Sequence, residues 1–174
     1  GSFGGGWGFN VPTQDLADAF EPGDPRKDAT IIFRGETTPE GDAIPVTGDN
    51  PMYNQKSYVP FGEYSGECSE GSGQNVRVMR YAEILLMNAE AANELGQSAQ
   101  ALSSLNAVRA RARAGNNAIL PDVTTTNKDD LRTAIWQERR VEVAMEFDRF
   151  FDLVRQDRAA TVLGSKGFVA GRNE

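Results

Sequence analysis

Histidine is absent from the 174-residue sequence, and cysteine occurs once, at Cys68. Without histidine, the hydrolase mechanisms that use a histidine base, histidine-ligated zinc and the usual proton shuttle at neutral pH are all excluded. A single cysteine excludes an internal disulfide and a metal site of the CxxC type. The acids Asp122, Asp129 and Asp130 lack the spacing of an EF-hand loop. We therefore expect neither a metal site nor a cofactor.

Basic residues and long hydrophobic runs are also scarce. The 18 lysines and arginines are outnumbered by 25 aspartates and glutamates, which gives a net charge of −7. Because phosphate binding needs a basic surface, nucleic acid is not expected as a partner. No apolar run approaches the roughly 20 residues that cross a bilayer, and the first residues lack the pattern of a signal peptide. The sequence does not begin with methionine, so we expect a piece of a longer protein with room for one domain.

Residues 1–75 form a segment that holds most of the glycines and seven of the eight prolines. One short helix is predicted at residues 12–20, where Thr13 can cap it and the following Pro-Gly cluster ends it. A short strand is predicted at residues 30–33, and turns and extended loop at 35–73. A loop of this length in a compact domain is usually functional or held against another part of the protein. We expect this segment to lie on the ligand side.

Residues 76–158 show the periodicity of helices and form the predicted scaffold. One helix is predicted over 78–95 and a second over 98–114, with Ser98 as the cap of the second. Gly96 suits the left-handed residue that ends a helix, and so short a connection makes the two helices antiparallel neighbours. The small residues around this turn match one tetratricopeptide unit, which cannot bury its apolar face alone.

A third helix is predicted to begin at Thr126 or Asn127, each of which has an acidic residue three positions later, and to continue to Arg155. A bend or break is expected near residues 146–148. Apolar residues occupy nearly every face of this helix, which predicts burial between layers. Residues 159–174 are expected to form an extended, truncated tail. The predicted fold class is mainly α, with tetratricopeptide-like helical hairpins and a long, irregular, loop-rich N-terminal segment.

Three acids of the third helix, Glu138, Glu142 and Glu146, are interleaved with large hydrophobic residues. Two carboxylates across a cleft can hydrolyse a glycosidic bond, and acids can also hold a metal ion. Alternatively, arginines at helical spacing hold the acids in a structural network. Opposite charges stand three positions apart in the pairs Arg139/Glu142, Glu146/Arg149, Arg149/Asp152 and Asp152/Arg155. These pairs favour the structural network, because a paired acid is ionised and occupied.

The ligand-binding candidates belong to the glycine- and proline-rich segment. Trp7 stands among glycines, and an exposed indole can stack on the C–H face of a sugar ring. A second aromatic set on the loops comprises Tyr53, Tyr58, Phe61 and Tyr64. Each of these rings is equally compatible with packing under a loop. The predicted ligand-binding residues are Trp7, Asn10, Tyr53 and Tyr58, and no residue is predicted to be catalytic.

Three blocks of residues follow the order found in a known family. The first comprises 8–13, Leu16, Phe20 and 24–26; the second 80–91, 95–96, 101–102, 105–109 and 111–112; the third Leu131, Ile135, 138–142, Glu146, 149–153 and Arg155. Together they resemble the C-terminal part of the SusD/RagB outer-membrane nutrient-binding proteins of Bacteroidetes. The resemblance covers most of residues 7–158.

The resemblance implies helical hairpins packed against a loop-rich half, and a function without catalysis. Such a protein sits on the surface of the outer membrane, captures an oligosaccharide or other nutrient, and delivers it to a SusC-type TonB-dependent transporter. It touches the membrane only through a lipid anchor, which would lie outside these residues. The family's signal, lipidated cysteine, first repeats and Pro-rich tail are not in the sequence. Phe147 replaces a residue that is commonly small in the family, which is expected to change the local bend.

Two other functions are compatible with the residues. A helical adaptor would bind a protein segment in the groove of the hairpin and would bind no glycan. A glycosidase would use two acids of the third helix, which needs no histidine. The three hypotheses differ in whether the chain binds an oligosaccharide, whether it cleaves one, and whether Glu142 is structural or catalytic.

Overall fold

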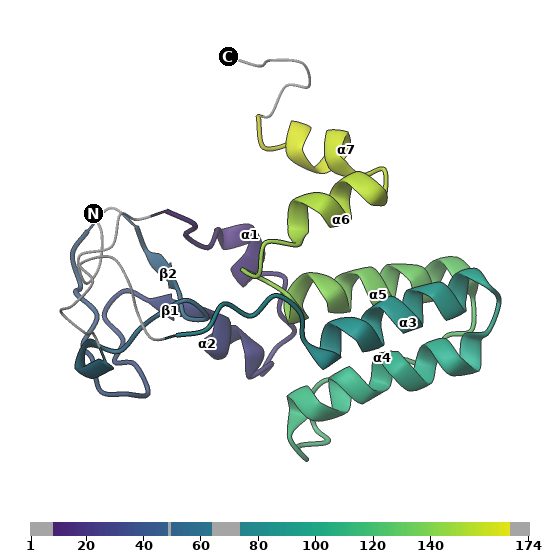
Figure 1. Cartoon of the computed structure of the whole chain (residues 1–174), viewed down its shortest axis with the longest axis horizontal. Helices are drawn as coiled ribbons and strands as arrows, with labels where there is room; N and C mark the ends of the chain where they lie inside the picture. Colours follow the sequence, from purple (N-terminus) through teal and green to yellow (C-terminus); the bar gives the residue numbers. More distant parts are fainter. Residues whose placement is uncertain (1–8, 49, 64–73, 168–174) are drawn as a thin grey trace.

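The structure is a computed structural model that describes residues 9–48, 50–63 and 74–167. Figure 1 shows three long helices side by side at one end and the loop-rich N-terminal part at the other. The long helices are α3 (Tyr81–Glu94), α4 (Ser98–Arg113) and α5 (Lys128–Glu142). Two short helices follow α5, namely α6 (Arg149–Arg155) and α7 (Ala159–Gly164). The predicted fold class, mainly α with a tetratricopeptide-like hairpin, is confirmed.

Helices α3 and α4 form the hairpin because Gly96 turns the chain between them. Gly96 has a φ of +75°, and the backbone nitrogen of Gln97 donates a 2.8 Å hydrogen bond to the carbonyl of Ala92 across the turn. Ala89 and Ala101 are completely buried, so the two backbones approach closely over small side chains. The larger side chains that join α5 to the hairpin are Leu86, Leu105, Val108, Leu131 and Ile135.

The starts of α3 and α4 differ from the predicted ones. Helix α3 begins three residues later than expected, because Arg80 has an extended backbone with φ −127° and ψ 154°. Ser98 does not cap α4: the N-cap is Gln97, which makes no capping hydrogen bond through its side chain. Residue 97 already closes the turn at Gly96, so α4 starts directly after it and Ser98 becomes its first helical residue.

Helix α5 begins at a clear capping residue. The side chain of Asn127 accepts hydrogen bonds from the backbone nitrogens of Asp129 and Asp130, at 3.0 and 3.1 Å. Of the two residues expected to cap this helix, Asn127 is therefore the N-cap and Thr126 is not. The two aspartates also place negative charge at the positive end of the helix dipole.

The predicted break in the third helix is confirmed, and it begins earlier than expected. Helix α5 ends at Glu142, and α6 starts at Arg149. Between them Met145 and Phe147 have left-handed φ angles of +64° and +76°. A side chain with a Cβ costs roughly 1–2 kcal/mol in this conformation, which glycine adopts freely. Phe147 thus occupies the position of the bend where a small residue was expected.

The prediction that the third helix is buried on nearly every face is wrong for its last part. Four apolar residues there are exposed, by 74% for Phe147, 54% for Phe150, 69% for Phe151 and 53% for Val154. After the break α6 leaves the line of α5 instead of extending it (Figure 1), so one face of α6 points outward.

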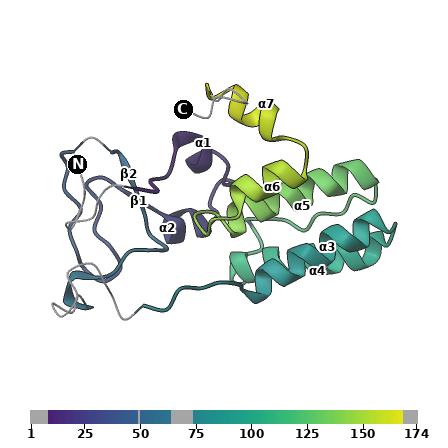
Figure 2. The same cartoon turned by 45° about the horizontal axis from the view of Figure 1, so that its top comes forward.

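The extended tail predicted from residue 159 is also corrected. Helix α7 forms over Ala159–Gly164 (Figure 2), where Ala159, Ala160 and Leu163 are good helix formers. Asp157 has a φ of +53°, and the nitrogen of Arg158 donates to the carbonyl of Leu153 at 2.8 Å. The chain therefore ends α6 with a left-handed turn and enters a new helix.

The N-terminal part contains more regular structure than the one helix and one short strand predicted for it. Its elements are α1 (Gln14–Ala17), α2 (Arg26–Thr30), β1 (Ile31–Phe33), β2 (Met52–Asn54) and a 3-10 turn, η1 (Phe61–Glu63). Thr13 caps α1 as predicted. Helix α2 was not expected; the carboxylate of Asp24 accepts from the backbone nitrogen of Arg26 at 2.9 Å and Pro25 precedes the first turn.

Strands β1 and β2 pair antiparallel, with Ile32 opposite Tyr53. Strand β1 falls within the predicted strand, whereas β2 lies in the predicted loop. A second core packs this part against the end of α5; it comprises Ala17, Phe20, Ile31, Met52, Val141 and Ala144. The C-terminal end of α5 is therefore the junction between the loop-rich part and the helices.

Candidate functional site

The acids of α5 point into this junction and are held by arginines from distant parts of the chain. The Glu138 and Glu142 side chains are only 2% exposed. Nη1 of Arg26, on α2, lies 2.5 Å from Glu138 Oε1 and 3.1 Å from Glu142 Oε2. Nη1 of Arg109, on α4, donates to the other oxygen of Glu138 at 2.8 Å. Guanidinium groups from both halves of the molecule therefore neutralise Glu138.

Glu142 also accepts hydrogen bonds from Arg80 at 2.9 Å and from Arg111 at 3.1 Å. Burial alone would raise the pKa of Glu142. The hydrogen bonds and positive charges of Arg80 and Arg26 outweigh burial and hold this pKa below its ordinary value. Glu142 is thus ionised and fully occupied.

Glu146 is the third acid of this group and is bound in the same manner. Arg80 Nε and Lys56 Nζ donate to its two carboxylate oxygens at 2.7 and 2.6 Å. Burial would raise the pKa of Glu146, but these partners lower it. Burial also lowers the pKa of Lys56, against the pull of Glu146. All three acids are therefore bonded to at least two cationic side chains.

The arginine partners predicted at three-residue spacing are mostly wrong. Of the four predicted pairs, only Asp152 with Arg155 forms among the described residues, at 2.9 Å. The break between α5 and α6 removes the helical spacing on which the Glu146/Arg149 pair depended. The structural network is present, but its arginines come from α2, α4 and the residue before α3.

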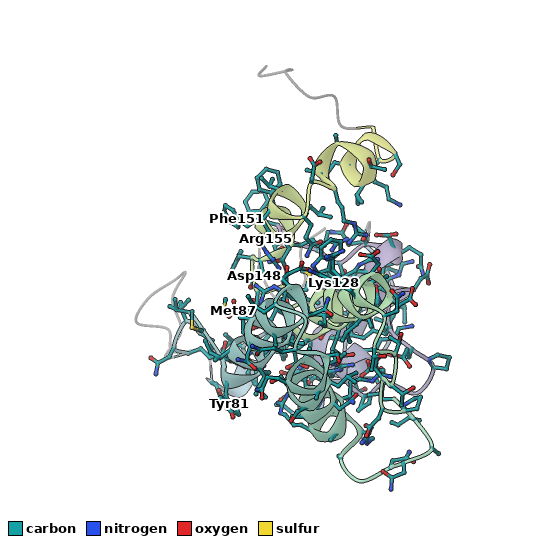
Figure 3. The ribbon with its side chains drawn as sticks, turned by 90° about the vertical axis from the view of Figure 1, so that its right-hand side faces the viewer. Tyr81, Met87, Lys128, Asp148, Phe151 and Arg155 are labelled. Carbon is teal, nitrogen blue, oxygen red and sulfur yellow. The ribbon has the colours of Figure 1, made fainter. Side chains whose placement is uncertain are left out.

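A second set of ion pairs fixes α6 to α3 and α5. Nε of Arg139 lies 2.8 Å from both carboxylate oxygens of Asp152. Arg139 also pairs with Glu83 on α3 at 3.2 Å. Arg155 reaches Glu90 on α3 at 2.5 Å. Figure 3 shows Arg155 on the inner side of α6 and Phe151 on its outer side. The position of α6, and of the break before it, is thus set by buried charges.

An aromatic pair lies in the loop-rich part and is held by one carboxylate. The hydroxyl of Tyr58 donates to Asp42 Oδ2, and the backbone nitrogen of Phe61 donates to the same oxygen at 2.9 Å. The two rings meet edge to face with centroids 6.5 Å apart. Burial and the Asp42 carboxylate raise the pKa of Tyr58 to about 12. The hydroxyl therefore stays protonated and anchored.

Asp42 itself is fixed by a tight turn. The backbone nitrogen of Thr38 donates to the carbonyl of Asp42 at 2.9 Å, and the nitrogen of Asp42 donates to Thr38 Oγ1 at 3.2 Å. Gly41, inside the turn, has a φ of +98°, which favours glycine. Local sequence thus builds the support for Tyr58.

Tyr58 lines a polar hollow of about 500 Å³, which we call the Tyr58 hollow. Its other walls carry amides and charges of both signs, among them Gln55, Lys56, Glu63, Gln74 and Arg77. An aromatic side chain beside several hydrogen-bonding groups suits a polyhydroxylated ligand, whose C–H face can pack on a ring while the polar groups bond its hydroxyls.

Two further hollows follow, of which only the first adjoins the Tyr58 hollow. A central hollow of about 250 Å³ shares Lys56, Gln74 and Arg77 with the Tyr58 hollow and extends to Met145 and Phe147. A third hollow of about 230 Å³, the Arg149 hollow, shares Met145 and Phe147 with the central one. Its further lining includes Asn10, Val11, Pro12, Arg140, Arg149 and Phe150. The three hollows therefore follow one another across the junction, with Phe147 between the last two.

The predicted ligand-binding residues fall in different places. Trp7 lies outside the described residues. Tyr58 lines the first hollow and Asn10, with a left-handed φ of +53°, lines the third. Tyr53 lies on β2 and lines none of these three hollows. Ligand contact by each of the four stays a prediction.

Phe147 and Arg149 line the hollows but were not among the ligand candidates. Phe147 was expected to be a buried helix residue, and Arg149 an ion-pair partner of Glu146 and Asp152. The one signal in the sequence was Phe147 itself, a large ring where the resembling family commonly has a small residue.

Within 9–48, 50–63 and 74–167, no cluster of three or more cysteine or acidic side chains could hold a metal ion. None of the helices in these ranges has the length and apolar character required to cross a membrane.

Comparison with known proteins agrees with the arrangement of the hairpin and junction. The profile of the SusD family, SusD_RagB, matches residues 2–169. The chain belongs to the SusD family. SusD-like protein P2 of Formosa agariphila is 31% identical to this SusD-family chain in an alignment of 175 positions. The alignment covers 95% of the chain and 34% of that protein. SusD-like protein P38 of the same organism is 41% identical over 93 residues, 52% of the chain and 18% of that protein.

Solved structures of other SusD-like proteins have the same fold. A laminarin-binding SusD-like protein superposes with a TM-score of 0.69 at 35% identity, covering 92% of this SusD-family chain and 33% of that chain. A SusD-like protein from Bacteroides fragilis gives a TM-score of 0.66 at 28% identity, covering 84% and 36%. The chain thus spans about a third of the length of the relatives that it matches over most of its residues.

Proposed function

We propose that this chain is part of a cell-surface binding protein that captures an oligosaccharide without cleaving it. The observation that carries the proposal is the Tyr58 hollow, in which a ring anchored by Asp42 stands beside amides and charged groups. Rings held in advance bind sugars at a lower entropic cost than mobile ones. The laminarin-binding relative supports a glycan as the ligand.

Capture without catalysis follows from the state of the acids. Glycoside hydrolysis needs one carboxylic acid that holds a proton and one carboxylate that faces the sugar. Glu138, Glu142 and Glu146 are each bonded to two or more cationic groups. Their role in this proposal is to fix the junction on which the hollows lie.

Delivery is the second half of the proposal and rests on family membership. In this proposal the whole protein is held at the surface of the outer membrane by a lipid anchor outside these residues. It passes the captured glycan to a SusC-type TonB-dependent transporter. The helices serve as a rigid scaffold and as a docking face for that transporter.

Calorimetric titration of the chain with neutral oligosaccharides, including laminarin fragments, tests capture. The Tyr58→Ala variant should bind the best ligand at least tenfold more weakly, because the stacking face is lost. Tyr81→Ala is the matched control, since Tyr81 is 76% exposed on α3 and lines none of the three hollows. It should bind as the unmodified chain does.

Other outcomes of this titration would overturn the proposal. If no oligosaccharide binds and a protein segment is bound instead, the chain is a helical adaptor. If Tyr58→Ala binds with unchanged affinity, the Tyr58 hollow is not the site. The same measurement on Trp7→Ala decides whether Trp7 contributes to binding.

A further inference from the structure

Arg149 differs from the other arginines of the junction because no carboxylate pairs with it. Its side chain is half-buried at the start of α6, and within the described part of the chain it makes no hydrogen bond or salt bridge. Arg26, Arg80 and Arg109, in contrast, each bond to at least two acids. A partly buried guanidinium without a partner is costly, so this position favours binding of an anion.

The charges around Arg149 do not supply that anion. Burial lowers the pKa of Arg149, and the neighbouring guanidinium groups of Arg140 and Arg158 lower it further. The carboxylates of Asp152 and Asp15 act in the opposite direction and raise this pKa in part. Both are already engaged by other cations.

Asp152 is bonded to Arg139 and Arg155. Asp15 is bonded to Arg140 at 2.6 Å and lies 3.6 Å from Lys166. The Arg149 hollow therefore holds a surplus of positive charge in a chain whose net charge is −7. Such a local excess attracts an anion against the overall charge of the protein.

The residues that line the Arg149 hollow indicate which class of anion it binds. Beside Arg149 they are largely apolar, formed by Val11, Pro12, Phe147 and Phe150. Phe147 and Phe150 are both exposed, so their rings are accessible. Apolar and aromatic faces pack on the C–H surface of a sugar, and a guanidinium binds a carboxylate or sulfate through two parallel hydrogen bonds. A free inorganic anion would use the guanidinium alone.

We propose that the Arg149 hollow is a subsite for an anionic sugar unit, one that carries a carboxylate or a sulfate ester, with Arg149 as the residue that selects it. The proposal rests on the glycan binding proposed above and extends it. The central hollow shares lining residues with both the Arg149 hollow and the Tyr58 hollow, and in this proposal one oligosaccharide chain runs along all three. Phe147 lines both the central hollow and the Arg149 hollow.

The test uses the whole chain and three oligosaccharides of equal length: one neutral, one containing uronic acid and one sulfated. We expect at least one anionic ligand to bind tenfold or more tightly than the neutral one, and this advantage to shrink as salt is added. Comparison of the uronate and sulfate ligands identifies the anion. Inorganic sulfate should not compete at similar concentrations, because it lacks the sugar face.

Arg149→Met is the decisive variant, because it keeps an apolar stem and removes the charge. It should lose the preference for the anionic ligand and bind the neutral ligand as before. Its melting temperature should not fall, since no ion pair is broken within the described residues. Arg132→Met is the charge-matched control: Arg132 pairs with Glu94 on the surface, lines none of the three hollows, and its loss should leave the preference unchanged.

The outcomes separate the two proposals. If the neutral and anionic ligands bind equally, or Arg149→Met keeps the preference, the anionic subsite is wrong and neutral glycan capture stands. If inorganic sulfate competes with the anionic oligosaccharide at similar concentrations, the hollow binds an anion and not a sugar unit. If none of the three oligosaccharides binds, glycan capture itself is wrong.

Discussion

Nη1 of Arg80 donates a 2.9 Å hydrogen bond to Oε1 of Glu142, although 62 residues separate them. This bond ties the residue before α3 to the last residue of α5. Arg80 also reaches Glu146, within the break that follows α5, at 2.7 and 2.9 Å. The start of the hairpin, the end of α5 and the edge of the central hollow are therefore held by one side chain.

Replacing the carboxylate at the centre of this network should strongly destabilise the protein. In Glu142→Gln the guanidinium groups of Arg26 and Arg80 lose a buried negative partner. Breaking a buried ion pair on one side costs on the order of 3 kcal/mol or more. Urea unfolding followed by circular dichroism measures this loss.

Glu94→Gln is the matched control for that substitution. Glu94 pairs with Arg132 and Lys128, but its side chain is 43% exposed, and exposed pairs contribute at most about 1 kcal/mol. A glycosidase would show the opposite pattern for Glu142→Gln, with unchanged stability and loss of reducing-sugar release. That result would contradict the structural role of Glu142.

Stability should fall in acid because of the same carboxylates. Glu142 and Glu146 have lowered pKa values in the folded state, so the unfolded chain takes up protons at a higher pH than the folded chain does. Their contribution is complete above an unfolded pKa of about 4.5 and is lost as the pH falls through the lower folded pKa. Urea midpoints measured from neutral pH down to about pH 3 should show this decline, and Glu142→Gln should weaken it. A midpoint that rises in acid would refute the assignment.

The N-terminal cap of α5 gives a prediction at a single residue. Asn127→Ala removes an acceptor that bonds to two backbone nitrogens, and should cost about 1 kcal/mol of unfolding free energy. Thr126 was the other predicted start of this helix. Its substitution Thr126→Ala should change the unfolding free energy by less than about 0.5 kcal/mol. Thermal and urea unfolding of both variants distinguish them; equal losses would show that the cap is shared.

Phe147 should show opposite effects on stability and on binding. Phe147→Gly relieves a left-handed backbone at φ +76°, so unfolding free energy should stay unchanged or rise by up to about 1 kcal/mol. Phe151→Gly, an equally exposed phenylalanine inside α6, should instead lose about 1 kcal/mol. Titration of Phe147→Gly should nevertheless show weaker oligosaccharide binding, because the ring lines two of the hollows. Unchanged affinity would remove Phe147 from the site.

Much of the helical part could be predicted because its signals are local. Gly96 marks the turn of the hairpin, Asn127 the start of α5, and the apolar periodicity the helices between them. Helix α2 and strand β2 could not be predicted in the same way. The first has only five residues, too few to show helical periodicity, and the second depends on pairing with residues about twenty positions earlier.

The site was less predictable than the fold. Tyr58 could be named as a candidate because a loop-borne ring is a local feature. Its support by Asp42 could not, since the two are joined only when the loop closes. The three-residue spacing around Arg149 predicted two ion pairs, but a break in the helix and the preference of Asp152 for Arg139 left it without either among the described residues.

The sequence by itself determined that the chain forms a helical hairpin, breaks its third long helix and has no histidine chemistry, because propensity, capping and composition act over a few residues. Only the tertiary structure decided which arginine neutralises which acid. A buried carboxylate pairs with the cation that packing brings within about 3 Å, wherever that cation lies in the chain. The same packing gathers Tyr58, Phe147 and Arg149 along one junction, although nearly a hundred positions separate the first from the last.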